Sequence, residues 1–180
     1  MTTTTIKSIG FCAHYSKQGD WAFKHALALA QERGLQLNVF HFLKDPYDPS
    51  GSPAVEETGP ELERLARDRE RELRLYYDDL AGEYLNIGFR LCVEDSWKEL
   101  HGCLLARQFQ VLFLAHPGFD AYFCGKPIDT FAETFVCPIV LVGPHSPTQF
   151  RLNGGAALIF DQLGLAKGTW SRLDPVPTPR

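Results

Sequence analysis

Apolar positions up to residue 142 alternate between strand-like and helix-like spacing. Short apolar runs of strand length recur at 6–13, 35–43, 89–93, 111–115 and 136–142. Between them, apolar residues return every three or four positions, as on one face of a helix, at 20–33, 61–85, 96–107 and 130–135. Strands therefore alternate with helices. This order predicts an α/β fold, an open five-stranded parallel sheet with helices on both faces.

Helix ends are marked by capping residues. Asp20 is the candidate N-cap of the first helix, and Gly34 follows its last turn as a left-handed stop. Ser96 and Glu99 have the spacing of a capping box for the third helix. The stretch 44–60 between the second strand and second helix is rich in proline and glycine, and it is predicted to be a long surface loop.

The chain divides into a domain at 1–145 and a C-terminal extension at 146–180. The extension is irregular and rich in turn residues. Ala156 to Phe160 is a candidate small strand, and Trp170 is a candidate anchor on the domain. Beyond Leu173 we expect disorder, because the sequence there offers little apolar surface to bury.

Charge and cysteine content narrow the function classes. With 18 basic and 22 acidic residues the net charge is −4, and no basic patch is visible, so we expect no nucleic-acid partner. No apolar run approaches the roughly 20 residues of a membrane span, and no secretory signal is present at the start. The five cysteines are scattered, which predicts reduced thiols of a cytoplasmic protein and no metal site.

Several local strings resemble the universal stress protein family. The match runs from Ile6 to Val142, and its most specific parts are V-L-F-L-A-H at 111–116, T-F-A-E at 130–133 and C-P-I-V-L-V at 137–142. The resemblance implies an adenine nucleotide alpha hydrolase-like sandwich and a role in stress physiology. It also implies a homodimer paired through the last strand, 136–142, whose uncharged edge needs a cover. The competing cover is the chain's own tail.

The ATP-binding members of that family carry an aspartate after the first strand and a glycine-rich segment after the fourth. Here Cys12 stands at the aspartate position, Ala115 replaces the first glycine, and Thr130 lacks its preceding glycine. Bulky or acidic residues occupy the segment: Phe119, Asp120, Tyr122 and Phe123. We therefore expect no tightly bound ATP and no cofactor. The alternative is an adenine nucleotide held by unusual contacts.

Ligands of open α/β sheets bind beyond the carboxyl ends of the strands, where the strand order switches. The residues that this rule and the resemblance bring to one crevice are Cys12, Ala13, His14, His116, Gly118 and Thr130. One hypothesis is a small enzyme using His14 and His116, with Cys12 or Cys124 as a nucleophile. The simpler interpretation is a core cysteine beside two histidines in a wet cleft. No oxyanion motif can be named, so we assign no catalytic residue.

The sequence thus predicts a stress-protein-like regulatory protein that is not an enzyme. Whether it has a protein partner, and which one, the sequence leaves open. The crevice carries three loop aromatics, Phe119, Tyr122 and Phe123. We expect these rings to close over the crevice and to fill the space that phosphates occupy in ATP-binding relatives.

Overall fold

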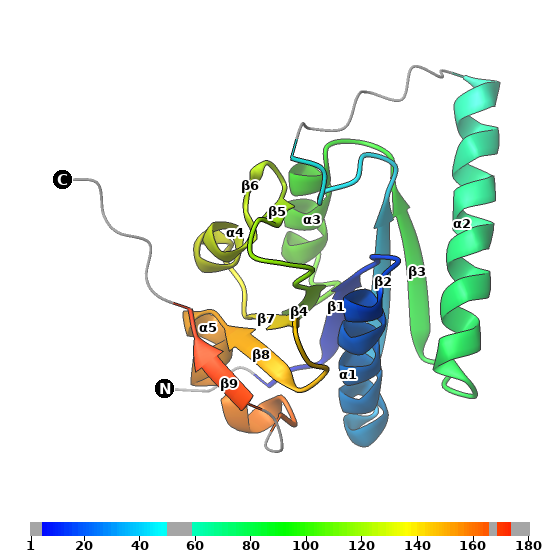
Figure 1. The fold of residues 1–180 in the computed structure, drawn as a ribbon. Helices are drawn as coiled ribbons and strands as arrows, with labels where there is room; N and C mark the ends of the chain where they lie inside the picture. The colour runs from blue at the N-terminus through cyan, green and yellow to red at the C-terminus, as the bar shows by residue number, and fades with distance from the viewer. Residues whose placement is uncertain (1–4, 50–58, 166–168, 174–180) are drawn as a thin grey trace.

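The computed structural model describes residues 5–49, 59–165 and 169–173. A seven-stranded sheet in the order β3-β2-β1-β4-β7-β8-β9 runs through its centre (Figure 1). Five strands are parallel: β1 (Ser8–Cys12), β2 (Gln36–Phe42), β3 (Ile87–Cys92), β4 (Val111–Ala115) and β7 (Ile139–Val142). The predicted five-stranded parallel sheet is confirmed, and the order switches direction between β1 and β4.

Helices cover both faces of the sheet. α1 (Lys17–Arg33) and α2 (Pro60–Ala81) pack on one face, and α3 (Ser96–Leu105) and α4 (Ile128–Thr134) pack on the other. A small hairpin, β5 (Tyr122–Phe123) and β6 (Lys126–Pro127), precedes α4. Two apolar clusters, one on each face, make the core.

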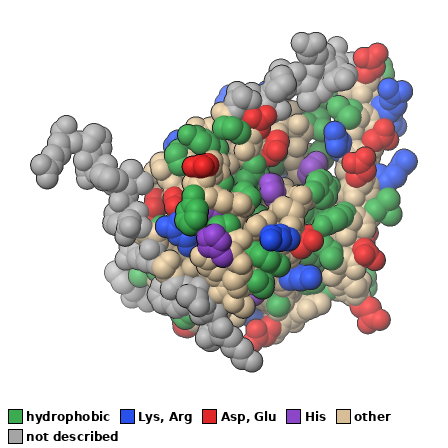
Figure 2. Space-filling model, in the orientation of Figure 1, with side chains coloured by type: hydrophobic (Ala, Val, Ile, Leu, Met, Phe, Trp, Pro, Cys, Tyr) green, Lys and Arg blue, Asp and Glu red, His purple; other side chains and the backbone are tan. Residues whose placement is uncertain are grey.

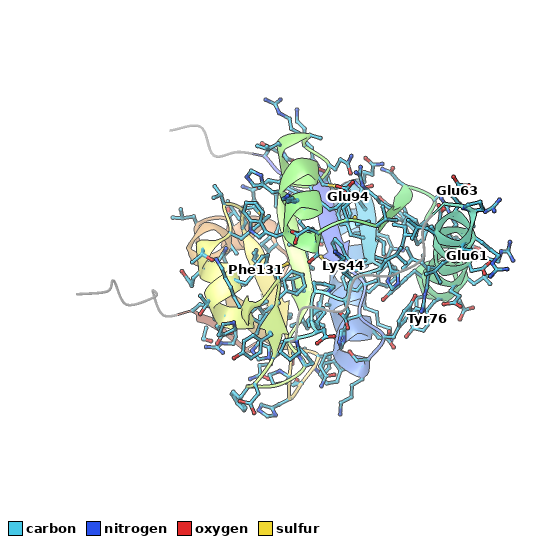
Figure 3. All side chains as sticks on the ribbon, turned by 90° about the horizontal axis from the view of Figure 1, so that it is seen from above. Lys44, Glu61, Glu63, Tyr76, Glu94 and Phe131 are labelled. Carbon is cyan, nitrogen blue, oxygen red and sulfur yellow. The ribbon has the colours of Figure 1, made fainter. Side chains whose placement is uncertain are left out.

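Helix α2 meets the body only along its second half. Its buried residues are Leu73, Tyr77 and Ala81, and charged side chains gather along its outer side in Figure 2. Figure 3 shows Tyr76 on the side of α2 that faces the body, with Glu61 and Glu63 at the near end of the helix. The hydroxyl of Tyr76 donates to the Asp20 carboxylate at 2.5 Å, which ties α2 to α1.

Two predicted helix caps are wrong by a few residues. The N-cap of α1 is Ser16, whose hydroxyl accepts from the Gly19 N–H, and Asp20 lies in the first turn. The N-cap of α3 is Asp95, whose carboxylate accepts from the Lys98 N–H, so Ser96 is already helical. In both cases two polar residues near the helix start are competent caps, and the earlier one in the chain takes the position.

The last parallel strand is not an exposed edge, so the premise of a dimer paired through it is wrong. β8 (Gln149–Leu152) pairs antiparallel with one side of β7, and β4 pairs with the other side of β7. β9 (Thr169–Arg172) then pairs parallel with β8. The chain's own extension therefore supplies the cover that an uncharged edge requires.

The rest of the extension also departs from expectation. Ala156 to Phe160 is not a strand, because helix α5 (Gly154–Leu158) and a 3-10 turn (Phe160–Gln162) occupy it. Phe150 and Leu152 of β8 join the same apolar cluster as α1. The predicted disorder beyond Leu173, the middle of the 44–60 loop and the contacts of Trp170 lie outside what the structure describes.

Candidate functional site

Five connecting segments meet at the carboxyl ends of the parallel strands, as the strand order requires. The switch point between β1 and β4 lies at their centre. Cys12 ends β1 and is fully buried, and burial raises the pKa of its thiol well above the ordinary value. Ala13 is also buried, and its N–H donates to the Phe40 carbonyl at 2.7 Å. A buried thiol that holds its proton is not an activated nucleophile, which favours the core interpretation of Cys12.

His14 is half-buried and fixed from two sides. Its Nδ1 lies 2.7 Å from the Ser16 hydroxyl, the same oxygen that caps α1. A Cβ on Gly19 would fall 1.8 Å from the His14 carbonyl oxygen, so only glycine lets the helix approach so closely. Burial lowers the pKa of His14 and nearby Asp45 opposes this, which favours a neutral ring at pH 7.

The centre of the crevice is filled by Tyr47, from the segment after β2. Its ring lies 4.2 Å from that of His14 and 5.0 Å from that of Phe123, centroid to centroid. Its hydroxyl donates to the Ala115 carbonyl at the end of β4, at 3.0 Å. Tyr47 therefore spans the gap between β1 and β4. The sequence marks it only as an aromatic residue in a proline-rich loop.

Of the three aromatics predicted to close the crevice, Phe123 alone is buried there. Phe123 packs on Phe131 of α4 at 4.6 Å and on Tyr47. The prediction is wrong for Phe119, which is 78% exposed, and for Tyr122, which is 36% exposed. Tyr122 and Phe123 are neighbours in β5, and successive side chains of a strand point to opposite sides.

His116 is built into a polar network instead of the open crevice. It is 1% exposed, and its Nε2 lies 3.3 Å from Oδ1 of Asp129 in the first turn of α4. The other oxygen of Asp129 accepts from the Arg151 guanidinium of β8 at 2.7 Å. Contact with His116 first, and with Arg151 next, holds the pKa of Asp129 below its ordinary value. Arg151, in the extension, gave no sequence signal for this role.

Two observations argue against a phosphate cradle beside Gly118 and Thr130. Gly118 has a φ that any residue adopts and open space where a Cβ would stand, so nothing there requires glycine. Thr130 lies inside α4, and its carbonyl accepts from the Thr134 hydroxyl. The first turn of α4 carries the Asp129 carboxylate, which would repel a phosphate at that helix end.

The residues predicted for one crevice thus separate into three environments. Cys12 and Ala13 are core, His14 packs against Tyr47 with the two rings tilted, and His116 lies beside Asp129. Within the described residues no group of three or more histidine, cysteine and acidic side chains is arranged to hold a metal ion. In the same part of the chain, no helix has both the length and the apolar character needed to cross a bilayer.

Open clefts remain on either side of the segment that carries Tyr47. One, of about 320 Å³, is lined by His14, Tyr15, His41, Asp45 and Arg69 among others. The other, of about 300 Å³, is lined by Asp45, Asp48, Asp95, Ser96, Trp97 and Cys124 among others. Burial raises the pKa of the Cys124 thiol to about 11, so this cysteine too is protonated at neutral pH.

No family model and no curated protein sequence matches the chain. Solved structures do. A universal stress protein in complex with cAMP aligns with a TM-score of 0.55 and 15% identity, over 78% of this chain and 99% of that one. A universal stress protein from Archaeoglobus fulgidus aligns with a TM-score of 0.51, 12% identity, and 75% and 97% coverage. A protein of the universal stress protein family from Burkholderia pseudomallei aligns with a TM-score of 0.50 and 15% identity, over 77% of this chain and 96% of that one. The resemblance to universal stress proteins is therefore confirmed at the level of the fold.

Proposed function

We propose that the protein is a regulatory protein of the universal stress protein type that acts by binding, without turnover, and does not bind ATP tightly. The observation that carries this proposal is Tyr47. Its ring fills the switch point between β1 and β4 and packs against the buried ring of Phe123. Its hydroxyl donates a hydrogen bond to the Ala115 carbonyl. A ligand at this place must first displace a buried aromatic side chain.

The electrostatics support the same proposal. Asp129 holds its negative charge at the start of α4, and Arg151, the nearest cation, is already paired with it. A triphosphate would bring further negative charge to a site where the Arg151 guanidinium is already paired with Asp129. The observations do not favour the enzyme alternative, because His116 is buried beside Asp129 and burial raises the pKa of the Cys12 thiol well above its ordinary value.

A thermal-shift screen tests this proposal. The protein is heated with ATP, AMP and cyclic nucleotides, each with and without magnesium, because a ligand that binds the native state raises the melting temperature by mass action. We expect no shift with ATP at millimolar concentration. A saturable ATP-dependent rise would overturn the proposal.

A second candidate is an adenine nucleotide bound outside the filled switch point. It is favoured by the cleft of about 320 Å³, where two imidazoles and the Arg69 guanidinium face one space. Burial lowers the pKa of His41 as it does that of His14, so both rings are suited to hydrogen bonding or stacking as neutral groups. A structural neighbour is described in complex with cAMP. Titration with cAMP and AMP tests this candidate, with Arg69→Gln expected to weaken binding and Arg64→Gln as the control.

Self-association stays a prediction, but the interface expected from the sequence, through the last parallel strand, is already occupied by β8. If a homodimer forms, it does not pair through β7, which has strands on both sides. Light scattering at concentrations well above micromolar measures the mass directly, and a monomeric mass contradicts the prediction.

A further inference from the structure

A groove of about 720 Å³ lies at the opposite end of the strands, where the parallel strands begin. The segment before β1, the end of α3, the linker before β7, and α5 form its walls. The side chains that line it are mainly apolar: Ile6, Leu104, Phe109, Val136, Leu158 and Ile159. Val136 and Leu158 are 81% and 83% exposed. Grooves of this size and character are typical of small-ligand sites.

Arg107 is the one charged residue among those that line the groove. Its guanidinium makes no ion pair with any residue that the structure describes. An exposed cation that no described residue pairs with, beside an apolar surface, is complementary to an amphipathic anion.

The backbone of Arg107 gives a second, independent observation. Helix α3 ends in a Schellman turn, in which the Gln108 N–H donates to the Cys103 carbonyl and the Arg107 N–H donates to the Leu104 carbonyl. Arg107 occupies the left-handed position of this turn with φ +61°. Glycine is the residue that this position favours, since a side chain there is strained. The turn therefore does not explain why an arginine stands here.

We propose that the groove binds a medium-chain fatty acid such as dodecanoate, with the hydrocarbon chain on the apolar walls and the carboxylate on Arg107. A guanidinium fork matches a carboxylate in shape and in charge, one to one. All of the apolar side chains named above except Phe109 are aliphatic, which suits a flexible chain better than a planar ring system. The site shares no residue with the crevice of the proposed function, so the two proposals are tested independently.

Calorimetric titration of the full-length protein with dodecanoate, below its micelle concentration, tests the proposal. Dodecyltrimethylammonium keeps the chain and reverses the charge, and butanoate keeps the carboxylate and removes most of the chain. We expect saturable binding of one dodecanoate per chain. Both control ligands are expected to bind about tenfold more weakly or worse, since each loses one of the two interactions.

The Arg107→Gly variant separates binding from folding. Glycine suits the left-handed position, so the melting temperature stays the same or rises. Loss of the charge-assisted hydrogen bond is expected to lower dodecanoate affinity about tenfold or more. Leu158→Asp places a carboxylate at the exposed rim and is expected to weaken binding similarly, whereas Leu75→Asp, at an exposed position of α2, leaves it unchanged.

Three outcomes overturn the proposal. One is the absence of saturable dodecanoate binding by the parent protein. Another is binding that does not depend on the charge pair, seen as equal affinity for the cationic and anionic ligands and for the parent and the Arg107→Gly variant. The third is a dimer that Leu158→Asp dissociates, with no fatty acid bound, because the groove is then an interface between two copies of this chain.

Discussion

The two ends of the parallel sheet have opposite characters. At the carboxyl ends Tyr47 and Phe123 fill the switch point, Arg151 pairs with Asp129, and Nε2 of His116 lies 3.3 Å from the same carboxylate. At the amino ends lies an apolar groove beside Arg107, which makes no ion pair with the residues that the structure describes. Open α/β sheets usually bind ligands beyond the carboxyl ends of their strands, and in this molecule an apolar groove also lies at the amino ends.

Truncation of the ring that fills the crevice has the largest expected effect. Tyr47→Ala removes a buried aromatic side chain and should lower the free energy of unfolding by about 3–5 kcal/mol, with Phe123→Ala similar. Phe119→Ala, in the same region but 78% exposed, should cost almost nothing. Urea denaturation measures all three. Equal stability of Tyr47→Ala and Phe119→Ala would show that Tyr47 is not packed in the crevice.

Asn153 offers the matching test near the amino ends. Its amide oxygen accepts from the N–H groups of Ile139 and Ala156, and its amide nitrogen donates to the carbonyls of Ala132 and Cys137. Asn153→Ala leaves these buried groups without partners and should destabilise the protein by about 3 kcal/mol. Chemical denaturation measures it. A loss below that of an average surface substitution would mean that α4, β7 and α5 are not joined through this side chain.

Tyr47→Phe isolates the hydroxyl from the ring. The ring still fills the crevice, but the Ala115 carbonyl loses its donor, so we expect a loss of about 1–2 kcal/mol. The difference between this variant and Tyr47→Ala, both measured by urea denaturation, is the contribution of the ring. If the two variants lose the same amount, the hydrogen bond and not the packing holds the segment in place.

The smallest expected effect belongs to the Asp129 network. The pKa of Asp129 is lowered from 3.8 in the folded protein. Its contribution is therefore complete above the unfolded pKa and is lost as the pH falls through the lower, folded value. Asp129 is 42% exposed, so solvent screening reduces the cost of Asp129→Asn at pH 7 to about 1 kcal/mol. The stabilities of parent and variant should converge as the pH falls below 3.8, and a constant difference across the acid range would contradict this assignment.

The fold was accessible from the sequence because each element carries its own periodicity. β4 and β7 are continuous apolar runs, and α2 repeats apolar residues at helical spacing, so strand and helix order follow from local pattern alone. β8 was not predicted: its four residues do alternate polar and apolar, but a period-2 run of this minimum length is weak evidence for a strand. Its antiparallel pairing with β7 is a local connection through the segment 143–148, and it covers the uncharged edge of β7.

The candidate site was less accessible from the sequence. The sequence places His14 and His116 after β1 and β4, which is correct, but it cannot show that His116 turns to Asp129. Tyr47 lies 68 residues from the carbonyl that its hydroxyl reaches. Which aromatic fills the crevice depends on the paths of two loops, and composition alone does not determine them.

Calorimetric titration of the parent protein with ATP and magnesium tests the central claim most directly, namely that this chain's own side chains fill the crevice at the switch point. We predict no saturable heat at micromolar ATP, because Tyr47 and Phe123 occupy the space and Asp129 opposes a phosphate at the start of α4. A low-micromolar affinity would contradict the account, and a structure of that complex with Tyr47 displaced into solvent would show how.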